Sequence, residues 1–143
     1  MFSQDRNKLR QFYVDAWHKR RQQQPMQPLE ILVADVITDH PEYHALLEAA
    51  EPRLEQDFFE QVGDTNPFLH MGMHISLREQ LGAGRPEGIR DLYQQLLHAT
   101  GSAHDCEHQM MGCLQASLWQ AQQAGTMPDE GEYLACLRTL LRK

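Results

Sequence analysis

The chain has 143 residues, of which 41% are hydrophobic and 23% charged, and its formal net charge is −7. This length and composition are typical of one soluble globular domain, 1–143, with enough apolar residues for a sizeable core. The acidic balance argues against a surface that coats nucleic acid, and no apolar run is long enough to span a membrane. We therefore expect neither kind of partner.

The cysteines and the first residues of the chain indicate the cellular compartment. Three cysteines, an odd number without the spacing of a disulfide framework, are typical of a reducing environment. The opening residues lack the charged and apolar regions of a secretory signal. We predict a cytoplasmic protein whose thiols are buried and inert, with a redox pair of cysteines as the alternative.

Prolines mark the starts of the first predicted helices. An amphipathic segment, 4–23, is followed by 28–38, whose opening proline suits the first turn of a helix. The run from Ile31 to Ile37 is strand-like, but its position after a proline favours a short buried helix. The next predicted helix, 41–61, also begins at a proline, and Pro52 should kink or split it because its ring clashes with the preceding turn.

In the second half of the chain, prolines and glycines again mark the predicted helix boundaries. Asn66 is a capping residue before a first-turn proline, so a helix is predicted over 67–81. Gly101 and Gly125 lie where helices should end. The remaining predicted helices are 86–99, 102–124 and 128–142. The pattern as a whole predicts an all-α fold, a single compact bundle of about six to seven helices with short loops.

Six of the eight histidines form pairs spaced four residues apart. Random placement of eight histidines in 143 positions would give about 0.4 such pairs, so the pattern is informative. Residues four apart share one face of a helix, and each pair can direct two imidazoles at one point. Helical bundles build interior metal sites in this way. The pairs are His40/His44, His70/His74 and His104/His108.

His70 and His74 lie on or beside the apolar stripe of their predicted helix, whereas Arg78 turns away. A buried histidine needs a polar partner, because an unpaired polar group costs about 1–3 kcal/mol. A backbone carbonyl satisfies one histidine, but a shared metal satisfies two neighbours together. Gly72 either admits another backbone or leaves room for a ligand.

His104 and His108 flank a glutamate on the same predicted helix. Glu107 projects between the histidines and the apolar stripe. We predict it as an inward carboxylate that acts as metal ligand or as general base. The string His-x-x-Glu-His also matches the inverted zinc-protease signature. That motif is short enough to arise by chance and its enzymes are large, so we do not predict a protease.

The pair His40/His44 is the weakest candidate for a shared helix face, because Pro41 places His40 at a helix cap. His44 shares a helix face with Glu48, which adds a carboxylate to this group. For His40 alone, a capping or surface role is the alternative. We expect His40, His44 and Glu48 to complete a second site or to support the first from outside.

The ligand types limit the metal. Imidazole nitrogen suits zinc, iron, copper and nickel, and a carboxylate shifts the preference toward iron or manganese. Six histidines exceed the needs of one tetrahedral ion, so the full set implies two metals or one site with supporting residues. We predict iron or zinc, with manganese or copper as alternatives. Nearby methionines and Cys106 would favour cuprous copper, although methionines at helical spacing are more typical of a core.

Three segments resemble an uncharacterised bacterial family, the domain of unknown function 1841. They are His40-Pro41-Glu42-Tyr43-His44, Asn66-Pro67-Phe68-Leu69-His70-Met71-Gly72-Met73-His74 and Leu118-Trp119-Gln120-Ala121-Gln122. The similarity runs from about residue 4 to the C-terminus. The resemblance implies a single-domain bacterial protein, and it implies no reaction.

The functional hypothesis therefore depends on the histidines and carboxylates themselves. We predict a transition-metal-binding helical protein whose ligands are His70, His74, His104, His108 and Glu107. Whether it is a metal-dependent enzyme, or handles metal or oxygen, is left open. The alternative is a metal-free helical interaction module with buried structural histidines. The sequence identifies no small-molecule substrate and leaves a homodimer open.

Overall fold

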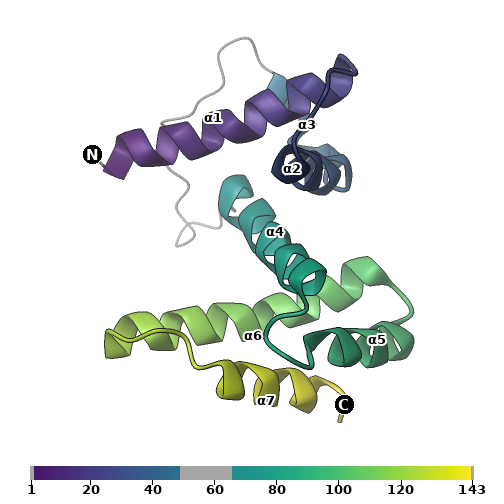
Figure 1. Ribbon diagram of the computed structural model, residues 1–143, viewed down its shortest axis with the longest axis vertical. Helices are drawn as coiled ribbons and strands as arrows, with labels where there is room; N and C mark the ends of the chain where they lie inside the picture. The colour runs from purple at the N-terminus through teal and green to yellow at the C-terminus, as the bar shows by residue number, and fades with distance from the viewer. Residues whose placement is uncertain (1, 49–65, 143) are drawn as a thin grey trace. The chain divides into compact units, whose positions relative to one another are not determined.

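The computed structural model describes residues 2–48 and 66–142, which form seven α-helices and one 3-10 helix without a strand. The predicted all-α fold is confirmed. The elements are α1 (Phe2–Arg21), α2 (Pro28–Thr38), η1 (Pro41–Tyr43), α3 (His44–Glu48), α4 (Pro67–Ala83), α5 (Ile89–Thr100), α6 (Ala103–Ala124) and α7 (Glu130–Leu140). The α-helices are labelled in Figure 1. Pro52 and residues 49–61 of the predicted helix 41–61 lie outside the described residues.

The chain divides into two compact units, Met1–Ile75 and Ser76–Lys143, and the division falls inside α4. Each unit has a buried apolar core of its own. The single domain predicted over 1–143 stays a prediction. Across the described ranges 2–48 and 66–142, we find no helix that combines the length and the apolar character needed to cross a membrane.

The core of the first unit joins α1, α2, α3 and the first half of α4. Phe68 at the start of α4 packs against Tyr13 of α1, with ring centroids 5.8 Å apart, and Arg10 lies over the same phenylalanine ring. These contacts hold the start of α4, the helix that carries His70 and His74. The core comprises Tyr13, Val14, Ala16, Trp17, Val33, Val36, Ile37, Leu47, Phe68, Met71 and Ile75.

Side chains at the helix starts explain why α2 and α4 begin where the sequence predicts. The backbone N–H of Gln27 donates to the Glu30 carboxylate at 2.8 Å, which completes a capping box at the first turn of α2. Asn66 Oδ1 accepts from the backbone N–H groups of Phe68 and Leu69, at 3.0 and 3.2 Å. The run that looked strand-like is therefore helical, and the cap predicted at Asn66 is confirmed.

The second unit packs α5 and α7 against the long helix α6, and α5 and α7 also contact each other (Figure 1). Ser102 accepts from the backbone N–H of Asp105 and caps α6, and Gly101 ends α5 with a φ of 75°, which glycine adopts without strain. The most deeply buried large side chains of this unit are Leu77, Ile89, Leu96, Met110 and Leu137.

Three predicted helix starts are wrong by two or three residues. The helix predicted from 4 begins at Phe2, and the other two errors involve a proline. The helix predicted from 86 begins at Ile89, because Gly88 takes a left-handed conformation, with φ of 95°, between the proline and the helix. The helix predicted from 128 begins at Glu130, because Asp129 caps it by accepting from the Glu132 N–H at 3.0 Å. In both places a better cap than the proline lies further along the chain.

Candidate metal centre

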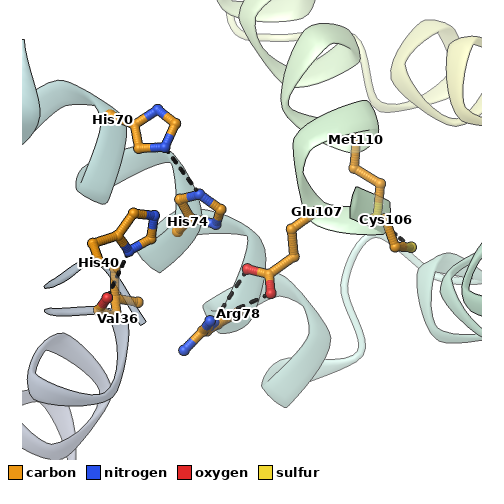
Figure 2. A network of polar contacts seen from close by, with 8 residues as sticks. All are labelled: Val36, His40, His70, His74, Arg78, Cys106, Glu107 and Met110. Carbon is orange, nitrogen blue, oxygen red and sulfur yellow. Dashed lines mark hydrogen bonds and ion pairs between the residues drawn. The ribbon is translucent and has the colours of Figure 1, made fainter. Parts of the chain in front are cut away.

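Three histidines from two separate segments of the first unit meet in space. His40 lies between α2 and η1, whereas His70 and His74 lie one turn apart on α4 (Figure 2). The nitrogen atoms that they offer as ligands all lie within 4.8 Å of one another. His40 and His74 are both 1% exposed, and His70 is half-buried. We call His40, His70 and His74 the histidine cluster.

The protonation of the His40 ring follows from its hydrogen bond. Its Nδ1 lies 2.7 Å from the carbonyl oxygen of Val36, in the last turn of α2. A carbonyl oxygen only accepts, so Nδ1 carries a proton and donates it. In the neutral ring the lone pair therefore lies on Nε2. Ligating histidines commonly use one ring nitrogen for the metal and donate the other to a backbone carbonyl, as His40 does here.

His70 and His74 face each other through the same ring atoms. Their Nε2 atoms are 3.3 Å apart, joined by the dashed line in Figure 2. One of these nitrogens carries the shared proton while the other accepts it. Two imidazole nitrogens bound to one tetrahedral ion at 2.0–2.1 Å would lie about 3.3–3.4 Å apart. The observed spacing therefore suits either a proton or a metal ion between the two rings.

Tyr43 is an aromatic neighbour of the histidine cluster that the sequence did not single out as a site residue. Its ring stacks on His40, with centroids 5.7 Å apart and planes 8° apart, and it meets the His70 ring edge-on at 6.3 Å. Burial, and to a smaller extent the charge of Glu42, raises the pKa of the phenol. The hydroxyl therefore keeps its proton at neutral pH beside the cluster.

His44 and Glu48, predicted with His40, lie in other interactions. His44 Nε2 donates to the carbonyl of Ile37 at 2.7 Å, and its ring packs on Trp17 with centroids 4.5 Å apart. Glu48 pairs with Arg21, at 2.5 Å between Nη1 and Oε1. The predicted pair His40/His44 is thus split: both rings cap the last turn of α2, but only His40 belongs to the histidine cluster.

Glu107 is buried, as predicted from the sequence, and its carboxylate is bound by Arg78. Nε and Nη2 of Arg78 donate to Oε1 and Oε2 of Glu107, at 3.1 and 3.3 Å, within the second unit (Figure 2). The prediction that Arg78 turns away is wrong, because the long arginine side chain brings its guanidinium back to the buried carboxylate. Glu107 thus forms an ion pair with Arg78, and its predicted role as metal ligand or general base stays a prediction.

His104 and His108 also lie on α6 in the second unit. Their rings meet edge-on with centroids 4.1 Å apart, so the pair predicted from the spacing does form. His104 is exposed and His108 is half-buried. Their role as metal ligands stays a prediction.

Cys106, considered above as a soft metal ligand, is a buried thiol of α6. Its sulfur lies 3.9 Å from the carbonyl oxygen of Tyr93 and 4.0 Å from Met110 Sδ. Burial, with a smaller contribution from the negative charge of Glu107, raises the pKa of the thiol to about 11. A thiol that stays protonated at neutral pH is a poor nucleophile and a poor ligand.

This environment predicts slow alkylation of Cys106 in the folded protein. At pH 8 a thiol of this pKa is only about one part in a thousand thiolate. Iodoacetamide should leave Cys106 unmodified in native buffer and label it fully in urea, as read by peptide mass spectrometry. Labelling at equal rates in the two conditions would contradict the buried, protonated state.

The other two cysteines correct the expectation of unbonded thiols. Cys113 of α6 and Cys136 of α7 form a disulfide, with Cα atoms 5.7 Å apart. Their 23-residue separation carries no disulfide signature, and only the packing of α7 against α6 brings them into range. Cys106 remains a free thiol.

The fold and the site define an all-α protein with a histidine cluster compatible with a metal site. Residues 5–139 match the model of a domain of unknown function (DUF1841), and the chain belongs to that family. The resemblance noted in the sequence is thereby confirmed. No curated protein and no solved structure matches the chain.

Proposed function

We propose that this protein binds a transition-metal ion through the Nε2 atoms of His40, His70 and His74. The observation that carries the proposal is the convergence of three largely buried imidazoles, with ligand atoms within 4.8 Å, from segments 30 residues and more apart in the chain. Burying three basic rings together is unfavourable if they charge, whereas a metal uses all three lone pairs in the neutral state.

The hydrogen bonds support the same ligand set. His40 donates Nδ1–H to Val36, which directs its Nε2 lone pair away from the backbone partner. The Nε2 atoms of His70 and His74 already have the spacing that a shared tetrahedral ion would impose. Three imidazoles suit zinc, iron and copper among the metals named above. Manganese, which prefers oxygen ligands, is less suited to this set.

Three protein ligands leave one position of a tetrahedral ion for water or substrate, as in catalytic zinc sites. A metal held there would supply a water molecule of lowered pKa or a polarising Lewis acid. The Tyr43 ring, stacked on His40, would form an aromatic wall of such a site. The metal-dependent enzyme is therefore the more specific form of this proposal.

A metal-free protein is the competing function, and one contact favours it. The 3.3 Å approach of the His70 and His74 nitrogens is also an ordinary hydrogen bond with one shared proton. In that case the histidine cluster is a buried polar network that stabilises the first unit. The two functions differ in whether an ion replaces the proton.

Elemental analysis of protein purified without a histidine tag separates them. We expect about one equivalent of zinc, iron or copper per chain, because three preformed ligands bind such ions tightly. A chelator should remove the metal and lower the melting temperature, since bound ligand stabilises only the folded state. Less than about 0.2 equivalents, with no thermal stabilisation on adding Zn, Fe(II), Mn or Cu, would overturn the proposal.

A further inference from the structure

The disulfide of the second unit is unequally covered at its two ends. Cys113 on α6 is 3% exposed, whereas Cys136 on α7 is half-buried. Both residues line a surface cavity of about 240 Å³ whose wall also includes Ser117, Gln120 and Glu132. A small thiol in this cavity can therefore reach the disulfide, and Cys136 is the more exposed of its two residues.

The helix that carries Cys136 has few other anchors among the residues described. α7 contributes two buried side chains, Tyr133 and Leu137, to the core of its unit, and the Tyr133 hydroxyl donates to Gln80 Oε1 at 2.7 Å. An 11-residue helix is too short to be stable by itself in water. The order of α7 therefore depends on these contacts and on its covalent link to α6.

We propose that the Cys113–Cys136 disulfide is a site of reversible thiol exchange, attacked at Cys136, and that its reduction loosens α7. The proposal is independent of the histidine cluster, which belongs to the first unit. Cys106 takes no part in it, because its side chain is completely buried and its sulfur lies against Met110. The ligand class is a low-molecular-weight thiol such as glutathione.

The exchange proceeds in two steps that conserve electrons. A thiolate attacks Sγ of Cys136, the bond between the two cysteines breaks, and its electron pair passes to Sγ of Cys113, which takes a proton from solvent. This leaves a mixed disulfide on Cys136. A second thiolate then attacks the non-protein sulfur, which releases a small-molecule disulfide and the Cys136 thiol. The protein disulfide is reduced and two thiols are oxidised.

Loosening α7 would also alter a second cavity. Tyr133 lines a larger hollow of about 310 Å³, together with Arg85, Leu114 and the exposed Leu118. Because Glu130 and Tyr133 of this lining belong to α7, the redox state of the disulfide would change the shape of that hollow. Thiol exchange at the disulfide would thus change the shape of a cavity within the second unit.

The site of attack can be located on the full-length, wild-type protein. Oxidised protein is incubated with millimolar reduced glutathione, quenched with acid, alkylated and digested for mass spectrometry. We expect glutathione on Cys136, the alkyl group on Cys113 and neither reagent on Cys106 before unfolding. Glutathione on Cys113, or a disulfide that remains closed until the protein is denatured, would overturn the proposal.

The loosening of α7 is measured by amide hydrogen exchange on the same samples. Reduction should speed amide exchange in α7 by at least about tenfold and leave α2, in the first unit, unchanged. A variant with Cys113→Ser and Cys136→Ser should show the fast α7 exchange with or without glutathione, which controls for effects of the reagent. Equal α7 protection in the oxidised and reduced wild type would show that the bond does not hold the helix, and would overturn the loosening.

Discussion

Replacing His40, His70 or His74 with alanine is expected to weaken metal binding at least about 100-fold. Loss of a residue that merely supports a ligand commonly costs 10–100-fold, and a ligand itself contributes more. The measurement is the apparent Kd for zinc, from competition with a chelator of known affinity. The folded state of each variant is checked by circular dichroism, because His40 and His74 are buried.

His44→Ala and His98→Ala are the matched controls for these substitutions. His44 binds the Ile37 carbonyl and packs on Trp17, so its removal should cost stability without changing metal affinity. His98 is exposed in the last turn of α5 and should change neither. Wild-type affinity in all three cluster variants would contradict the ligand set. The same assay tests the sequence-based prediction that His104, His108 and Glu107 belong to it.

The order of the effects also separates the cluster from a simple polar network. If one ion binds all three imidazoles, the three single variants should lose metal affinity to a similar extent. The double variant His70→Ala/His74→Ala should then bind metal little more weakly than either single variant. If only a hydrogen bond joins His70 and His74, the variants should change stability by about 1 kcal/mol each and show no dependence on added metal.

Arg78→Met is expected to be the most destabilising single change among the ion pairs formed within residues 2–48 and 66–142, by about 3 kcal/mol. The Arg78 and Glu107 side chains are 21% and 7% exposed, so the buried carboxylate would lose the guanidinium that pairs with it. Glu107→Leu should cost less, because the partly exposed guanidinium can still reach water. Arg78→Met combined with Glu107→Leu should recover much of the loss, since neither charge is then left alone.

The control is the Arg21–Glu48 pair, whose side chains are 56% and 31% exposed. Arg21→Met should cost at most about 1 kcal/mol, as exposed ion pairs do. Urea unfolding of the four variants gives the free energies and the coupling between Arg78 and Glu107. Equal costs for Arg78→Met and Arg21→Met would show that burial does not strengthen the pair. A loss of metal in Glu107→Gln would instead favour the ligand role predicted from the sequence.

Local signals predicted the helices well because caps and periodicity act within a few residues. Asn66, with its hydrogen bonds to the first turn of α4, and Ser102, with its bond to Asp105, mark the starts that the sequence indicates. The errors at 86 and 128 have the same local origin. Gly88 and Asp129 compete with the prolines as helix boundaries, and a proline alone does not decide between them.

Part of the candidate site followed from spacing as well. His70 and His74 were expected to face each other because they lie four residues apart on a helix, and their Nε2 atoms do meet. The same rule failed for His40 and His44. The first turn after Pro41 is a 3-10 helix, so the two rings do not share an α-helical face, and each binds a different carbonyl at the end of α2.

The amino-acid sequence by itself determined the all-α class, most helix boundaries and the shared helix faces of His70/His74 and His104/His108, because these depend on neighbours along the chain. Only the tertiary structure decided which residues from distant segments meet. It brought His40 to His70 and His74, Arg78 to Glu107, and Cys113 to Cys136. Such meetings depend on how whole helices pack and on the direction of loops between them, and no spacing within one helix specifies that.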